Sequence, residues 1–312
     1  MRLPEWLIER GIGETRAVRI ERGEIVEARI WLDGVAAAGS VLNASLKASG
    51  TPAVAVADGA EYLLPKGAPG ITQGAALTIE VTREAIPGAE PWKRPLAQLA
   101  DGSAAGTPSL QGEQLAFPAP DDRLEAAGWS DLLDEARSGT IGFPGGMLRV
   151  SPTPAMTLID VDGTLAPADL ALAGAKAAAR AIVRHGIGGS IGIDLPTVAG
   201  KTVRQAIGEA IDAILPAPFE RTAVNGFGFV QIVRPRRHAS LFELAADRAA
   251  FEARALLRRA GRLTGTVTLT AAPAVFAAIR DEWREALSSQ VGGALTLHAD
   301  PSLAISGGHA QV

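Results

Sequence analysis

The chain has 312 residues, of which 47% are hydrophobic and 4% are aromatic, and its formal net charge is −4. The apolar fraction excludes wholesale disorder, the length allows two or three domains, and the mild acidity predicts no general attraction to nucleic acid. The absence of cysteine excludes a disulfide framework and a thiolate zinc site. Because the N-terminus mixes charges into its apolar stretch and no apolar run could span a bilayer, we expect a soluble, cytoplasmic protein with no membrane partner.

The first third of the chain is typical of a small β domain. Between residues 15 and 84, short alternating segments are separated by turn signals, namely TRAVRIERGEIVEARIWL, SVLNASLKA, PAVAVADG, EYLLP and ALTIEV. They fit a small barrel of the OB type, although another small β domain fits equally well. We expect this domain over residues 1–96, followed by a linker rich in Pro, Gly, Ala and Ser over residues 97–120.

The rest of the chain alternates helical and strand patterns. Residues 122–139 have helical spacing, and a hairpin is expected around Pro144–Gly145–Gly146. Strands and helices then alternate in AMTLIDVDG, ADLALAGAKAAARAIVRHG, SIGIDLP, VRQAIGEAIDAIL and FGFVQIVRP. We therefore expect an α+β multidomain protein, with a central α/β core over residues 121–244 and a small C-terminal α/β domain over residues 245–312.

Three aspartates lie at the ends of two predicted strands. Asp160 and Asp162 are two residues apart and so point to one face, and Asp194 ends the next strand. Ligands of open α/β sheets bind outside the carboxyl ends of strands. Three carboxylates suit Mg²⁺ or Mn²⁺, which could activate water and stabilise charge on a phosphodiester. A turn at Asp162–Gly163 and a helix cap at Asp194 explain the same residues without a metal.

Two other strings suggest phosphate chemistry. DVDGTL, from Asp160 to Leu165, matches the first motif of haloacid-dehalogenase-like phosphatases, in which the first Asp is the nucleophile and the second a general acid. Lys201 follows downstream, but no GDxxxD-like acidic pair does. AGKT imitates the end of a P-loop, yet Leu195 stands where that loop needs glycine. The P-loop is excluded, and the phosphatase remains an alternative.

Three motifs, in order, resemble the catalytic core of the ribonuclease E/G family. They are FPGGMLRVSPTPAMTLIDVDG, IGID ending at Asp194, and FGFVQIVRPRR. The resemblance implies an OB-like RNA-binding barrel, a deoxyribonuclease-I-like catalytic domain and a small C-terminal domain. It implies a Mg²⁺-dependent endoribonuclease acting on single-stranded RNA, with catalytic Asp160 and Asp194, and with Asp162, in place of the family's Asn, completing the metal ligands. Lys93 matches a family lysine that contacts RNA.

The chain also departs from that family. The cysteine pair that links family protomers through zinc is absent, which excludes a zinc-linked dimer and leaves any other homo-oligomer open. The linker at residues 97–120 replaces the long segment that holds the family's sensor of RNA 5′ ends. The barrel segment offers only Tyr62 for base stacking. These departures support a second hypothesis, an RNA-binding protein with weakened catalysis.

Arginine is concentrated after residue 218. Arg234, Arg236 and Arg237 directly follow a predicted strand, so we expect them near the acidic residues, where they would contact RNA phosphates. The helical spacing of the later arginines predicts a solvated helix face instead, made of Arg254, Arg258, Arg259 and Arg262.

Overall fold

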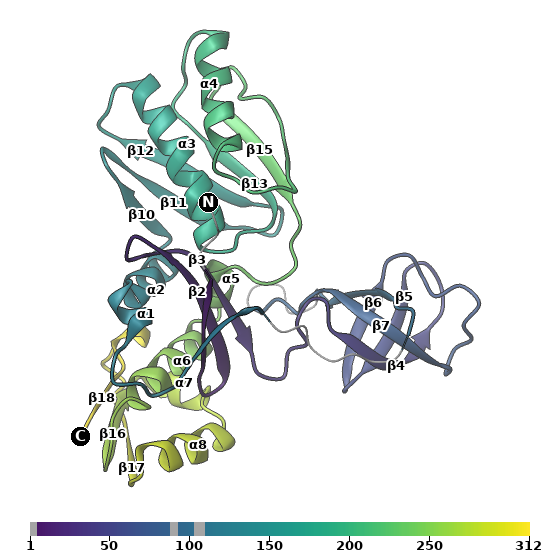
Figure 1. Ribbon diagram of the computed structural model, residues 1–312, viewed down its shortest axis with the longest axis vertical. Helices are drawn as coiled ribbons and strands as arrows, with labels where there is room; N and C mark the ends of the chain where they lie inside the picture. Colours follow the sequence, from purple (N-terminus) through teal and green to yellow (C-terminus); the bar gives the residue numbers. More distant parts are fainter. Residues whose placement is uncertain (1–4, 88–92, 103–109) are drawn as a thin grey trace. The chain divides into compact units, whose positions relative to one another are not determined.

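The computed structural model describes residues 5–87, 93–102 and 110–312 of the chain. It is a mixed α/β structure that contains a closed five-stranded barrel and several other sheets (Figure 1). The chain divides into two compact units, and each unit contains segments that are distant in sequence. The first holds residues 1–33, 111–137 and 244–312, and the second holds residues 34–110 and 138–243. This division differs from the predicted succession of three domains and a linker.

Five strands of the second unit close the barrel in the order β4-β5-β6-β8-β7. Alternate residues of these strands fill the interior, among them the buried Leu46, Ile79 and Val81. The strands are β4 (Val41–Ala48), β5 (Ala53–Ala57), β6 (Ala60–Leu64), β7 (Ala76–Arg83) and β8 (Leu96–Leu99).

Two strands expected in the barrel lie elsewhere. The structure places β2 (Glu14–Glu21) and β3 (Glu24–Leu32) in a separate sheet of the first unit, so their predicted membership of the barrel was wrong. β8 completes the barrel instead, because it pairs with both β6 and β7, and the predicted linker therefore begins inside a strand. Residues 103–109 of that linker, and residues 88–92 before Lys93, lie outside the described residues.

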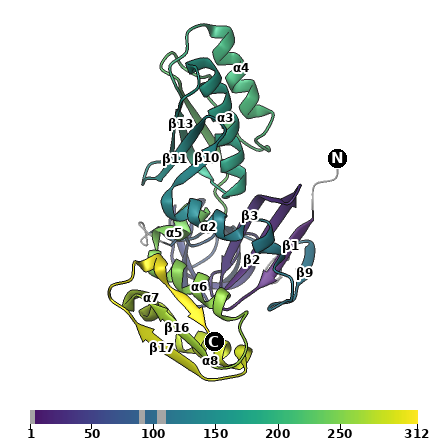
Figure 2. The ribbon, with the colours of Figure 1, turned by 90° about the vertical axis from the view of Figure 1, so that its left-hand side faces the viewer.

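The second unit also contains a six-stranded sheet in the order β10-β11-β12-β13-β15-β14, in which β12 and β13 are the parallel pair. Two helices, α3 and α4, cover one face of this sheet (Figures 1 and 2). The other face is exposed along β11 and β12, where buried and exposed residues alternate. The elements are β10 (Thr140–Phe143), β11 (Gly146–Pro152), β12 (Thr157–Gly163), α3 (Pro167–Arg184), β13 (Gly189–Asp194), α4 (Lys201–Asp212), β14 (Glu220–Arg221) and β15 (Phe229–Arg234).

Helix α3 follows directly after β12 and packs against it. Pro167 begins the helix, where its missing N–H leaves no hydrogen bond unmade. A Cβ atom at Gly174 would lie 2.3 Å from Val161 Cγ1, so this glycine allows the helix to approach the strand closely. The helix ends before His185 and Gly186, whose φ is +66°. This packing fixes the buried face of β12 and, with it, the direction of the exposed face.

The first unit contains two sheets and several helices (Figure 2). Its four-stranded sheet has the order β3-β2-β1-β9, and its three-stranded sheet has the order β17-β16-β18. Strands β16 and β17 are parallel and are joined through α7 and α8, which makes a β-α-β unit. The elements not yet given are β1 (Trp6–Arg10), β9 (Gly112–Leu115), α1 (Arg123–Ala126), α2 (Trp129–Ser138), α5 (Leu241–Ala246), α6 (Arg248–Ala260), β16 (Val267–Ala271), α7 (Pro273–Ala277), α8 (Asp281–Val291), β17 (Leu295–Ala299) and β18 (His309–Gln311).

Buried ion pairs join α6 to β1 and β2 within the first unit. Arg258 donates to both carboxylate oxygens of Glu9 at 2.9 and 3.2 Å, and Arg254 donates to Glu14 at 3.1 Å. Arg16, which is fully buried, donates to both glutamates at 2.8 Å. The prediction of a solvated arginine face was therefore wrong for Arg254 and Arg258, because their partners lie more than two hundred residues away in the sequence.

Among the residues that the structure describes, no helix is both long enough and apolar enough to cross a membrane.

Candidate functional site

The three aspartates singled out by the sequence lie together on the exposed face of the six-stranded sheet. Asp160 of β12 is the register partner of Asp194 of β13, so the two side chains leave neighbouring parallel strands at the same level. Asp162 is two residues further along β12 and shares that face. All three residues are exposed. Asp194 is the last residue of β13, which puts the cluster toward the carboxyl ends of the parallel pair.

The negative charges of the cluster act on one another. Partial desolvation raises the pKa of the Asp160 carboxyl, and the charges of Asp162 and Asp194 raise it further. Arg149 lowers the pKa of the same carboxyl. The cluster is therefore electrostatically strained when all three groups are ionised, and a cation placed among them would relieve this strain.

Arg149 is the nearby cation that sequence reasoning missed. It lies on β11 as the register partner of Asp160, and its Nε is 3.9 Å from Oδ2 of Asp162. Its side chain is 64% exposed, so most of the guanidinium remains available to a ligand. The short turn at residues 153–156 joins β11 to β12 as antiparallel neighbours, and this pairing brings Arg149 opposite Asp160.

Apolar and amide side chains surround the acidic cluster on the same face. The side chains of Leu158 and Phe229 converge above Gly192, where a Cβ atom would lie 2.6 Å from the Phe229 ring and 3.0 Å from Leu158. Gln231 is the register partner of Gly192 and donates to the Ser190 hydroxyl at 3.1 Å. The exposed face thus offers carboxylates, one guanidinium, an amide and a partly apolar floor.

The carboxylates do not by themselves enclose a metal ion. Across the described residues, no group of three or more His, Cys, Asp or Glu side chains is arranged to hold one. Magnesium needs no such protein cage, since it keeps several waters and binds through one or two carboxylates together with substrate phosphates. The donor set, carboxylate oxygens only, therefore fits Mg²⁺ or Mn²⁺ better than a soft metal.

The predicted phosphate-binding arginines lie at the other end of the sheet. β15 runs antiparallel to β13, so Arg234 is the register partner of Gly189 and Phe229 that of Asp194. Five residue steps along β13 separate these two levels, a distance of about 16 Å at the usual rise of about 3.3 Å per residue. The expectation that Arg234, Arg236 and Arg237 end near the acidic residues was therefore wrong.

Arg236 and Arg237 take part in contacts that hold the chain together. Arg236 forms an ion pair with Glu243, which also accepts hydrogen bonds from the backbone N–H and hydroxyl of Ser240. The carbonyl of Arg237 accepts a hydrogen bond from the Glu84 N–H at 2.9 Å. Arg234 alternates with the exposed Val233 and therefore lies on the helix-covered side of β15.

Lys93 also lies away from the carboxylates. Its Nζ donates to the carbonyl of Pro154 at 3.4 Å, and Pro154 belongs to the loop between β11 and β12. That loop precedes the first residue of β12, whereas Asp160 lies at the middle of the strand and Asp162 near its end. Lys93 and the three arginines thus lie toward the amino ends of the parallel strands, opposite the acidic cluster.

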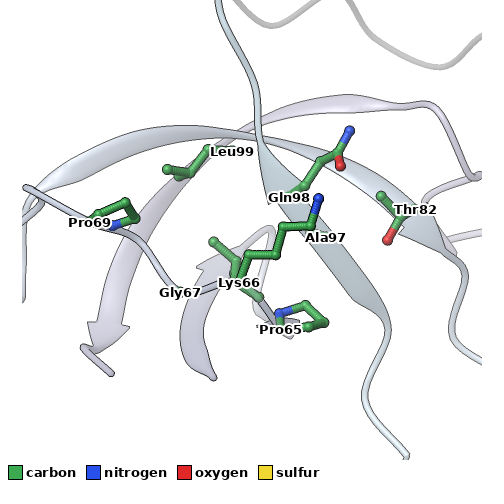
Figure 3. Close-up of a pocket in the computed structure, with 9 residues that line it drawn as sticks. Pro65, Lys66, Gly67, Pro69, Thr82, Ala97, Gln98 and Leu99 are labelled. Atoms are coloured by element: carbon green, nitrogen blue, oxygen red, sulfur yellow. The ribbon is translucent and has the colours of Figure 1, made fainter. Parts of the chain in front are cut away.

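The barrel contributes a pocket but no exposed aromatic side chain from its strands. Tyr62, the one aromatic residue of the five barrel strands, is 4% exposed and belongs to the barrel core. The pocket, of about 380 Å³, lies beside β8. Figure 3 shows Lys66 and Gln98 there with the apolar side chains of Pro65, Pro69 and Leu99.

A scan against protein-family models found no match for the chain, and a search of curated proteins found none either.

Proposed function

We propose that the protein is a metal-dependent endoribonuclease that hydrolyses phosphodiester bonds of single-stranded RNA. The observation that carries the proposal is the juxtaposition of Asp160 and Asp194 on neighbouring parallel strands, with Asp162 on the same exposed face. The order of the three sequence motifs that resemble the ribonuclease E/G family supports it independently. The proposal includes the OB type for the five-stranded barrel and the deoxyribonuclease-I-like type for the six-stranded sheet with its helices.

Asp160 and Asp194 are the residues best suited to hold the metal, because their side chains leave adjacent strands at one level. Asp162 adds a third carboxylate nearby; partial desolvation raises the pKa of Asp160, and the like charges of Asp162 and Asp194, which a cation would neutralise, raise it further. When bound, Mg²⁺ would supply an activated water and stabilise negative charge on the phosphodiester. The exposed face leaves room for that phosphodiester, since the covering helices lie on the opposite side.

The side chains around the carboxylates have separate roles in this proposal. Arg149 pairs only loosely with Asp162, at 3.9 Å, so it can turn to bind a phosphate oxygen of the substrate. Gln231 and Ser190 are held together by a hydrogen bond and present an amide and a hydroxyl to the RNA backbone. The basic end of the sheet, with Lys93 and Arg237, would bind RNA at a distance from the cleaved bond.

Two alternatives predict different behaviour. An RNA-binding protein with weakened catalysis would bind RNA without Mg²⁺ and would not cleave it. A haloacid-dehalogenase-like phosphatase would hydrolyse a generic phosphomonoester and would lose that activity in Asp160→Ala. The phosphatase has less support, because the DVDG string stays paired with β11 as far as Gly163.

The test is cleavage of a fluorescent single-stranded RNA in the presence of Mg²⁺. Asp160→Asn and Asp194→Asn each remove one candidate ligand with little change of shape, and both should lose activity. Asp101→Asn, which alters an exposed carboxylate in a bend far along the chain, is the matched control and should retain it. Equal cleavage by the wild type and both site variants would contradict the proposal, as would cleavage that survives EDTA unchanged.

A further inference from the structure

An exposed aromatic residue lies in a turn at the end of the strand that carries Asp194. Phe227 is 82% exposed, more than any other large apolar side chain among the described residues. It lies in the turn that leads into β15, two residues before Phe229, which is the register partner of Asp194. A ligand that covered this ring would gain the free energy of burying its apolar surface, which makes Phe227 a candidate contact for a ligand of the site.

The backbone of this turn is fixed by many hydrogen bonds. The Asn225 Oδ1 atom accepts from the N–H groups of Phe227 and Phe229 at 2.9 and 3.1 Å. The carbonyl of Phe227 accepts from the Thr197 hydroxyl at 3.1 Å. Because Thr197 follows Asp194 by three residues, this bond ties the turn to the end of the strand that carries the carboxylate.

Gly228 allows the close approach of the two segments. Its φ is +93°, and a Cβ atom there would lie 2.1 Å from the carbonyl oxygen of Leu195. The carbonyl of Gly228 accepts a hydrogen bond from the Leu195 N–H at 3.3 Å. The backbone of Phe227 is thus fixed against the segment that follows Asp194, and little ordering of this turn is needed when a ligand binds.

The surroundings of the ring are polar or small. Asn225, Gly226 and Thr197 are exposed, and a Cβ atom at Gly226 would meet no other atom within 4 Å. A protein-binding surface is a larger contiguous apolar patch, whereas this ring stands among polar and small residues and offers one flat apolar face. A nucleobase has such a shape, and every base presents a face that can stack on an aromatic ring.

We propose that Phe227 stacks on an unpaired base of the RNA nucleotide that lies next to the Asp194 carboxylate. This inference rests on the proposed function and adds a substrate-positioning residue to it. Phe227 supplies the aromatic platform that the barrel strands lack, since Tyr62 is buried in the barrel core. Stacking there orients the RNA strand so that the adjoining phosphodiester faces the carboxylates.

The test measures RNA affinity and cleavage in parallel. Anisotropy of a labelled single-stranded RNA in EDTA gives Kd without cleavage, and Mg²⁺-dependent cleavage gives KM and kcat. Phe227→Ala should raise Kd and KM about fivefold to a hundredfold, as loss of one stacked base does. Phe227→Trp should retain affinity, and Phe227→Leu, which keeps apolar area without a ring, should lose most of it. Leu297→Ala, at an exposed leucine of the first unit, is the control and should change neither constant.

The outcomes separate this inference from the proposed function. Equal Kd values for Phe227→Ala and the wild type overturn the inference, as does an effect on oligomeric state without an effect on Kd. Absence of RNA binding by the wild type overturns it as well. Binding that depends on Phe227, without any Mg²⁺-dependent cleavage, supports the inference and contradicts the proposed nuclease activity alone.

Discussion

Asp160→Asn should stabilise the folded protein at neutral pH. The substitution removes one of three negative charges on the exposed sheet face, where Asp194 lies on the neighbouring strand and Asp162 two residues along the same strand. Strand geometry puts these charges about 5 to 7 Å from that of Asp160. Each repulsion is then worth about 0.6–0.8 kcal/mol in water, and physiological salt about halves it. After the attraction of Arg149 is subtracted, the net gain is about 0.5 kcal/mol, or about 1–2 °C in Tm.

The pH dependence has a definite sign. The pKa of Asp160 is raised above its ordinary value of 3.8, so the folded state holds this proton more tightly than the unfolded state. The destabilisation is complete above the raised pKa and disappears as the pH falls below about 4. The difference in Tm between Asp160→Asn and the wild type, measured by thermal unfolding, should therefore shrink as the pH is lowered from 7 toward 4.

Magnesium should reverse the order of stability. A Mg²⁺ concentration ten times the Kd stabilises the wild type by about 1.4 kcal/mol, because the ion binds only the folded state. Asp160→Asn should gain much less, and Asp101→Asn should respond like the wild type. Two results together would contradict a repulsive carboxylate cluster that binds Mg²⁺. The Asp160→Asn protein would be no more stable than the wild type at neutral pH and low salt, and it would respond to Mg²⁺ equally.

Two further predictions concern the packing that supports the site and the fold. Arg258→Ala should lower the free energy of unfolding by about 3 kcal/mol or more, because it leaves Glu9 buried with fewer partners. The control Arg259→Ala, at an exposed position, should lower it by about 1 kcal/mol. Equal urea midpoints for the two variants would contradict this prediction. Gly174→Ala should lower the free energy of unfolding by about 1–3 kcal/mol, because the added methyl group overpacks against Val161. Gly208→Ala should lower it less, because its methyl group meets only the end of a side chain. Thermal unfolding measures both effects, and a stabilised Gly174→Ala protein would show that α3 can shift freely.

Local patterns in the sequence predicted the acidic strand ends well. The alternation in TLIDVDG matches the buried and exposed residues of β12, and the Asp160 and Asp194 side chains share one face. These features depend on a period of two residues and on the turns that bound each strand, both of which are visible in a single sequence.

The direction and partners of strands could not be predicted in the same way. FGFVQIVRP is recognisable as a strand, but nothing in it shows that it runs antiparallel to β13, which moves Arg234 to the end remote from Asp194. Barrel closure by β8 likewise depends on pairing with strands distant in sequence. Arg254 and Arg258 were misjudged for the same reason, because helical spacing gives no information about glutamates at the other end of the chain.

The central claim is that the carboxylates on the open sheet face bind a divalent cation. The most direct measurement is anomalous diffraction from crystals of the wild type soaked in Mn²⁺, with Asp194→Asn crystals as the control. An anomalous peak is expected within coordination distance of Asp160 and Asp194 in the wild type, and this peak should be lost or weakened in the variant. A wild-type crystal in which Mn²⁺ binds elsewhere, or an unchanged peak in Asp194→Asn, would contradict it.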